Sequence, residues 1–114
     1  MKEFVLLFQN APAGDNKPSP EQMQAIMKEW DNYMGSIAAQ GKYVSGSRLG
    51  GEGKTLKPGN VVTDGPYAEI KEILGGFIIV KADSLNEAFE MAYGCPILTV
   101  GGYVEVRPVI GTNE

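Results

Sequence analysis

The residues most suited to chemistry gather in one polar segment at positions 64 to 72. It carries the carboxylates of Asp64 and Glu69 and the ammonium group of Lys71, with the phenol of Tyr67 between them. A carboxylate transfers protons near neutral pH when burial raises its pKa, and an ammonium group binds anionic groups. A solvated loop would carry the same charges but would not require Tyr67. We therefore expect Asp64 to be the catalytic group of any reaction, and Tyr67, Glu69 and Lys71 to bind ligand.

A second pair of charges lies on the last apolar segment of the chain. Val104 and Val106 face one way there, while Glu105 and Arg107 face the other. If the valines lie under helices, the two charges point away from the core, where an isolated charge is too costly to bury. Two interpretations stay open: a structural Glu–Arg pair on a sheet edge, and two ligand-binding groups that line a pocket.

Composition excludes several classes of chemistry. The chain has no histidine, which removes the usual general base, the Ser-His and Cys-His nucleophiles and most zinc sites. Cys95 is the single cysteine, so no intramolecular disulfide can form, and its place at the end of a helix favours a buried structural thiol. A net charge of −4 argues against nucleic acid or an anionic membrane as a partner. We expect no cofactor and no metal.

Two capped helices alternate with apolar strands along the chain. Ser19, Pro20 and Gln22 form a capping box that begins a helix ending at Gly41, and Ser84 with Glu87 begins a second helix ending near position 94. The helices' apolar stripes are expected in the core: Met23, Ile26, Met27, Trp30, Met34, Ile37 and Ala38, then Leu85, Ala88, Phe89, Ala92 and Tyr93. Strands are expected at 4–8, 43–49, 77–80 and 103–110, with a short hairpin of 54–56 and 61–63.

This order is the split β-α-β repeat of a ferredoxin-like α+β fold with an inserted β-hairpin, in a single domain over residues 1–114. Strands 4–8 and 77–80 are apolar at every position, so both sheet faces need cover, and a second copy of the sheet supplies it. We group Phe4, Leu6, Phe8, Phe77 and Ile79 on one face, and Val5, Leu7, Ile78 and Val80 on the other. The sequence thus predicts a homodimer through its sheet faces, with Leu6 and Phe77 among the dimer-facing positions.

Residues 64–72, followed by Leu74-Gly75-Gly76-Phe77, resemble the signature of the DGPF branch of the YCII-related proteins, and residues 105–109 resemble that family's closing motif. Tyr67 stands where the branch usually has phenylalanine. The resemblance spans nearly the whole chain and implies a sheet-to-sheet dimer that forms an α/β barrel. Related proteins carry a histidine and an aspartate proposed as a catalytic pair. Only Asp64 matches here, so that proposal does not transfer.

The resemblance also implies a partner, because members of the branch are sometimes encoded beside extracytoplasmic-function sigma factors. Three functions follow. The first is a small dimeric protein that binds a small polar or anionic ligand in a cleft between the sheet and the 64–72 loop. The alternatives are a regulatory protein associated with a sigma factor and a carboxylate-dependent enzyme of unknown reaction. The apolar run at 4–8 is too short for a signal or a membrane span, so a cytoplasmic protein is expected.

Overall fold

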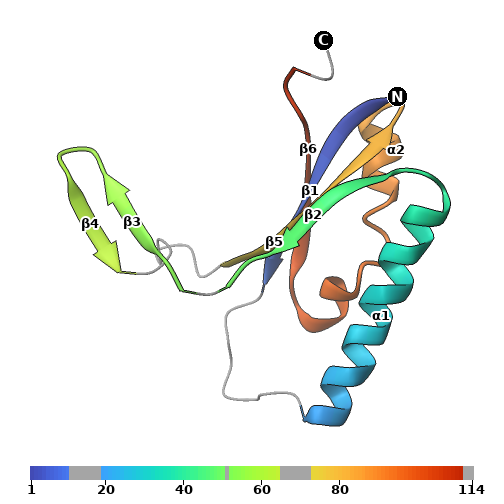
Figure 1. Ribbon diagram of the computed structural model, residues 1–114, viewed down its shortest axis with the longest axis horizontal. Helices are drawn as coiled ribbons and strands as arrows, with labels where there is room; N and C mark the ends of the chain where they lie inside the picture. The colour runs from blue at the N-terminus through green and yellow to red at the C-terminus, as the bar shows by residue number, and fades with distance from the viewer. Residues whose placement is uncertain (11–18, 51, 65–72, 112–114) are drawn as a thin grey trace.

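A computed structural model describes residues 1–10, 19–50, 52–64 and 73–111 of the chain (Figure 1). The elements of these residues follow in the order β1 (Lys2–Asn10), α1 (Pro20–Ala39), β2 (Tyr43–Arg48), β3 (Lys54–Lys57), β4 (Val61–Asp64), β5 (Ile73–Ala82), α2 (Leu85–Glu90), the 3-10 helix η1 (Pro96–Val100) and β6 (Tyr103–Pro108). β2, β5, β1 and β6 form, in that order, an antiparallel sheet, and β3 and β4 form a separate hairpin. The chain is therefore α+β and compatible with a ferredoxin-like fold, as the sequence predicts.

The core lies between the sheet and the helices. Leu6 lies opposite Ile78, and Phe4 opposite Val80, and directly opposed residues of an antiparallel pair share a face. These four side chains are at most 3% exposed and cluster with residues of α1 and α2, among them Ile37. One face of the sheet is thus covered by helices, and we call the other the open face.

The expected assignment of side chains to the two faces is correct within each central strand, but the faces of β1 and β5 were matched the wrong way round. Leu6 does not share a face with Phe77, because Leu7 lies opposite Phe77 and Val5 opposite Ile79 on the open face. Each strand is apolar at every position, so neither pattern alone reveals how the two are aligned. Leu6 is therefore a core residue rather than a dimer-facing one. Phe77 does lie on the face away from the helices.

The expected facing of β6 is confirmed. Val104 lies opposite Phe8, and Val106 opposite Leu6, and both valines pack against the core. Glu105 and Arg107 consequently lie on the open face. They sit on an edge strand of the sheet, where they form an ion pair with each other.

Helix α1 begins as expected but packs along only part of its length. The Ser19 hydroxyl accepts from the Gln22 amide at 3.1 Å, and the Gln22 side chain accepts from the Ser19 amide at 2.9 Å. Met23 and Met27 are each 46% exposed, so the predicted core stripe is wrong for the first turns, which extend past the end of the sheet (Figure 1). The packed part holds Trp30, Tyr33, Met34 and Ile37.

Helix α2 is shorter than predicted and its capping box is half formed. The Ser84 hydroxyl accepts from the Glu87 amide at 3.1 Å, but the Glu87 carboxylate pairs with Lys42 at 3.0 Å instead of returning to the cap. Of the expected apolar stripe only Ala88 and Ala92 are buried, whereas Leu85, Phe89 and Tyr93 are exposed. Pro96 then begins η1, which the sequence did not indicate, with Cys95 buried just before it.

The β3–β4 hairpin projects away from the sheet (Figure 1). Gly59 and Asn60 have φ angles of 86° and 62° at its turn, the left-handed conformation that these residue types tolerate. Leu56 and Val62 face each other on one side of the hairpin and are 68% and 59% exposed. The radius of gyration of 15.8 Å accordingly exceeds the value of about 13 Å expected for a compact chain of this length.

The corrected register makes a testable contrast between neighbouring leucines. Leu6→Ala removes a fully buried side chain, so the free energy of unfolding should fall by about 2–5 kcal/mol. Leu7→Ala on the open face should cost less than half as much under conditions where the protein is monomeric. Urea denaturation measures both, and equal losses would contradict the register.

Candidate functional site

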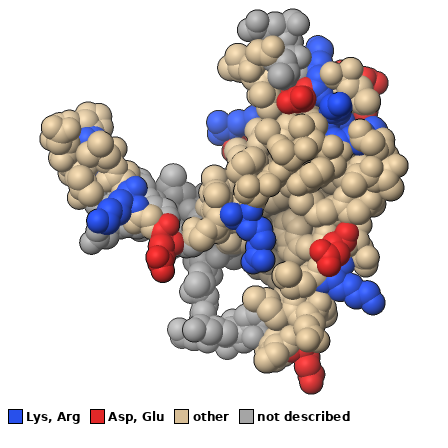
Figure 2. Space-filling view, in the orientation of Figure 1, with Lys and Arg blue, Asp and Glu red and all other residues tan. Residues whose placement is uncertain are grey.

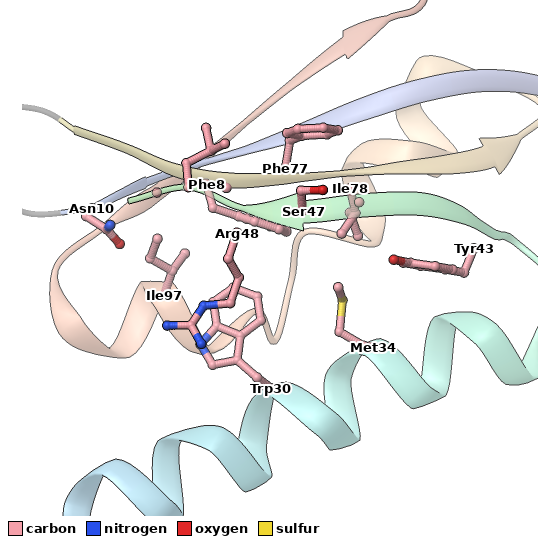
Figure 3. A pocket seen from close by; sticks show the side chains of 14 residues that line it. Phe8, Asn10, Trp30, Met34, Tyr43, Ser47, Arg48, Phe77, Ile78 and Ile97 are labelled. Carbon is pink, nitrogen blue, oxygen red and sulfur yellow. The ribbon is translucent and has the colours of Figure 1, made fainter. Parts of the chain in front are cut away.

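A cavity of ≈ 360 Å³ lies between α1 and the β2–β5 side of the sheet (Figure 3). Its walls are apolar and polar in about equal measure, and Trp30 and Met34 from α1 and Ile97 from η1 supply apolar surface. Polar residues also line it, among them Asn10, Tyr43 and Arg48. Concave sites that combine apolar and aromatic side chains with a few polar groups are typical of small-molecule binding. The cavity is therefore the best candidate site within the described residues.

Glycines shape the sheet wall of the cavity. Gly46 of β2 lies opposite Ile78 and faces the helices. A Cβ atom at Gly46 would lie 2.6 Å from the Phe77 carbonyl oxygen and 2.8 Å from Cγ2 of Ile78, so only glycine fits this close approach of β2 to β5. The wall therefore has no side chain at a helix-facing position of β2.

Arg48 provides the positive charge of the cavity. It lies two residues beyond Gly46 and opposite Gly76, so it shares the helix-facing side of the sheet. Figure 3 shows its side chain extending from β2 toward α1, with the guanidinium near Trp30. Lys42 and Arg107 are paired with carboxylates, whereas Arg48 has no carboxylate partner among the described residues. A guanidinium of this kind is available to an anion.

Trp30 is held in place by aromatic contacts. Its ring centroid lies 5.0 Å from that of Phe8 and 6.0 Å from that of Tyr33, both in edge-on geometry, an arrangement that aromatic pairs favour. The Tyr33 hydroxyl donates in turn to the Met91 carbonyl at 2.5 Å. The cavity wall formed by Trp30 is therefore anchored to the core.

Two buried groups behind this wall stay protonated at neutral pH. Burial raises the pKa of the Tyr33 phenol well above its ordinary value of 10.0, and the neighbouring Cys95 adds to this. Burial also raises the pKa of the Cys95 thiol above 9.0. Cys95 is 1% exposed, so the expectation of a buried thiol is confirmed. A protonated, buried thiol is a poor nucleophile.

The residues expected to form the site divide into two groups. Tyr67, Glu69 and Lys71 lie outside the described residues. Asp64 ends β4, and its side chain is also outside them. Glu105 and Arg107 are described: they form an exposed ion pair on the open face and do not line the cavity beside α1.

Arg48 and Trp30 were missed as site residues. A signal for them existed in the sequence, because counting by two from Gly46 places Arg48 on the same face of its strand. Trp30 was assigned to the ordinary core stripe, and it does pack against the core. That the same ring also lines a cavity depends on the distance between α1 and β2, which no pattern in either segment specifies.

The described charged side chains of both signs are mixed on one face of the molecule (Figure 2). On the face shown in Figure 2, uncharged side chains cover most of the body, and side chains of both signs are scattered around it. In the described parts of the chain, no three acidic, cysteine or histidine residues come together in a way that would hold a metal ion. No helix there is long and apolar enough to cross a membrane.

Comparison with known proteins identifies the family. The model of the YCII-related domain matches residues 3–113. An uncharacterized protein of Rhizobium meliloti (strain 1021) is 30% identical over 119 residues, covering 93% of this chain and 90% of the relative. The chain therefore belongs to the YCII-related family, as the motifs at 64–72 and 105–109 suggested.

The raised pKa values of Cys95 and Tyr33 predict a loss of stability at alkaline pH. The unfolded thiol and phenol lose their protons near pH 9.0 and 10.0, whereas the folded groups keep theirs to higher pH. The native state thus holds more protons above pH 9, and the free energy of unfolding should fall as pH rises from there. Urea denaturation between pH 7.5 and 10.5 measures this fall.

The control is the double variant Tyr33→Phe, Cys95→Ala, which removes both titrating groups. Its stability at pH 7.5 should be lower, because Tyr33 loses a hydrogen bond to Met91 worth about 1 kcal/mol. Its dependence on pH above 9 should be shallower than that of the wild type. Parallel pH profiles for the two proteins would show that these groups are not responsible.

Proposed function

We propose that this YCII-related protein is a homodimer that binds a small organic anion in the cavity between α1 and the sheet. The observation that carries the proposal is the Arg48 guanidinium, which lines the cavity beside Trp30 and has no carboxylate partner among the described residues. A guanidinium offers several donors in a planar fork and loses less hydration energy than an ammonium group when a ligand covers it. An anionic ligand bound here neutralises the positive charge of Arg48.

Binding is better supported than catalysis at this cavity. The chain has no histidine, and the described lining holds neither a carboxylate nor a thiol. Without one of these groups, the hydroxyl groups of the lining lack the usual base that would activate them for proton transfer or nucleophilic attack. A carboxylate-dependent reaction would thus have to use Asp64 or another group outside the described side chains, and this alternative stays a prediction.

The open face supports the dimer. Val5, Leu7, Phe77 and Ile79 form its half-buried apolar centre. Ser45 and Ser47 flank this centre on β2, and Glu105 and Arg107 flank it on β6. An apolar centre with a polar rim is the usual composition of a protein interface. We propose that a second copy of the sheet packs here, with the Glu105–Arg107 pair at the rim.

The remaining expectations stay predictions. They are the DGPF branch, the cytoplasmic location, a catalytic role for Asp64, and a ligand-binding role for Tyr67, Glu69, Lys71, Glu105 and Arg107. The regulatory partner, an extracytoplasmic-function sigma factor or a protein of its operon, rests on the resemblance alone.

Arg48→Gln should abolish the stabilisation that small organic acids confer. Binding to the native state raises the free energy of unfolding by about 2.7 kcal/mol when the ligand is at a hundredfold excess over Kd. A thermal-shift screen over small acids, amides and phosphates should therefore raise the Tm of the wild type with one or more acids. Lys28→Gln removes the same charge from an exposed position on α1 and should keep the shift. Equal shifts in wild type and Arg48→Gln would place the anion elsewhere.

Phe77→Glu should separate the dimer while leaving the fold intact, because it places a charge at the centre of the open face. Light scattering at micromolar concentration should give twice 12.3 kDa for the wild type and 12.3 kDa for the variant. Tyr93→Glu, at a 64% exposed position on the opposite side of the sheet, serves as the control and should remain a dimer. A monomeric wild type would contradict the dimer.

A further inference from the structure

Building on the proposed function, we propose that the anion is a single-ring aromatic carboxylate. Its carboxylate binds the guanidinium of Arg48, and its ring lies against Trp30 within the cavity. Three features of the cavity lead to this class of ligand: its volume, its charge and the composition of its walls.

The volume suits a small ligand. At ≈ 360 Å³ the cavity is at the lower end of the range of about 300–1,000 Å³ found for ligand pockets. One ring with a short side chain fits such a space. A nucleotide, with a base, a sugar and phosphates, needs a larger one.

The charge of the cavity favours a monoanion. Arg48 is the single cation of the described lining, which holds no lysine. Helix α1 begins at Pro20, well before Trp30, so its N-terminus supplies no amide donors to this space. Phosphate groups are commonly held by several donors or by a helix N-terminus. One planar guanidinium matches the two oxygens of a carboxylate instead.

The walls favour an aromatic body. Trp30 is held by its edge-on contacts with Phe8 and Tyr33, so its indole is already positioned before a ligand enters. Met34 and Ile97 supply further apolar surface, and a methionine sulfur makes favourable contacts with rings. An added ring–ring contact should make an aryl acid roughly 2- to 10-fold tighter in Kd than its alicyclic analogue.

The test uses the fluorescence of Trp30, the only tryptophan of the chain. Phenylacetate, cyclohexylacetate, acetate, inorganic phosphate and 2-phenylethanol are titrated into the wild-type protein. Phenylacetate should change the emission saturably and with the lowest Kd of the five. Cyclohexylacetate should bind several-fold more weakly, and the other three more weakly still.

Two variants separate charge from geometry. Arg48→Lys keeps the positive charge but loses the planar fork, and it should weaken phenylacetate binding at least tenfold. Lys28→Gln changes the net charge at an exposed position outside the cavity and should leave Kd unchanged. Circular dichroism confirms that each variant is folded before titration.

The outcomes distinguish this inference from the proposed function. If phosphate or acetate binds as tightly as phenylacetate and depends on Arg48, the aromatic class is wrong while anion binding stands. The same holds if none of these compounds binds but another acid of the thermal screen does so through Arg48. If 2-phenylethanol binds as tightly as phenylacetate and Arg48→Lys changes nothing, both are overturned. Absence of binding by every acid tested also overturns both.

Discussion

The pairing of β1 with β5 is the contact on which the rest of the structure depends. Their register decides that Leu6 and Ile78 enter the core while Leu7 and Phe77 occupy the open face. Each of these strands also carries an outer neighbour, β6 on β1 and β2 on β5. The register of β1 with β5 therefore also determines on which face of the sheet Glu105, Arg107 and Arg48 lie. A slip of one residue would exchange every side chain between the two faces.

This arrangement separates the two sets of charged groups. Glu105 and Arg107 form an ion pair with each other on the open face. Such an exposed pair contributes little to stability, about 0–1 kcal/mol. Arg48 lies on the helix-facing side, beside Trp30 and without a carboxylate partner among the described residues. A guanidinium that already has a carboxylate partner gains little from an anionic ligand, whereas one without a partner among the described residues gains more. The difference in partner, rather than in residue type, distinguishes the candidate site.

Much of the fold was predictable because its signals are local. Ser19 with Gln22 marks a helix start, and Gly41, with a φ of 70°, follows the helix end. The alternation of Val104 and Val106 with Glu105 indicated two faces without further information. The register between β1 and β5 was not predictable, because a strand that is apolar at every position can present either set of alternate side chains to the core. The exposure of Met23 and Met27 was hidden for a similar reason: a stripe shows which side of a helix is apolar, not how far the sheet beneath it extends.

The candidate site was less predictable than the fold. Polar segments attract attention in a sequence, and the prediction accordingly centred on positions 64 to 72. The cavity is instead lined by residues that look ordinary one at a time: a tryptophan in a helical stripe, glycines in strands and an arginine at a strand end. These residues come together only because β2 and α1 lie side by side, and the position of β2 depends on the pairing of β1 with β5.

Arg48 is proposed to hold an anion in the cavity beside Trp30. A crystal structure with 4-bromophenylacetate tests this most directly, because anomalous scattering locates the bromine and hence the ligand. The claim predicts the bromine peak inside the cavity and the carboxylate oxygens within hydrogen-bond distance of the Arg48 guanidinium. A ligand bound elsewhere, or an Arg48 side chain that pairs with a carboxylate of the protein itself, would contradict it.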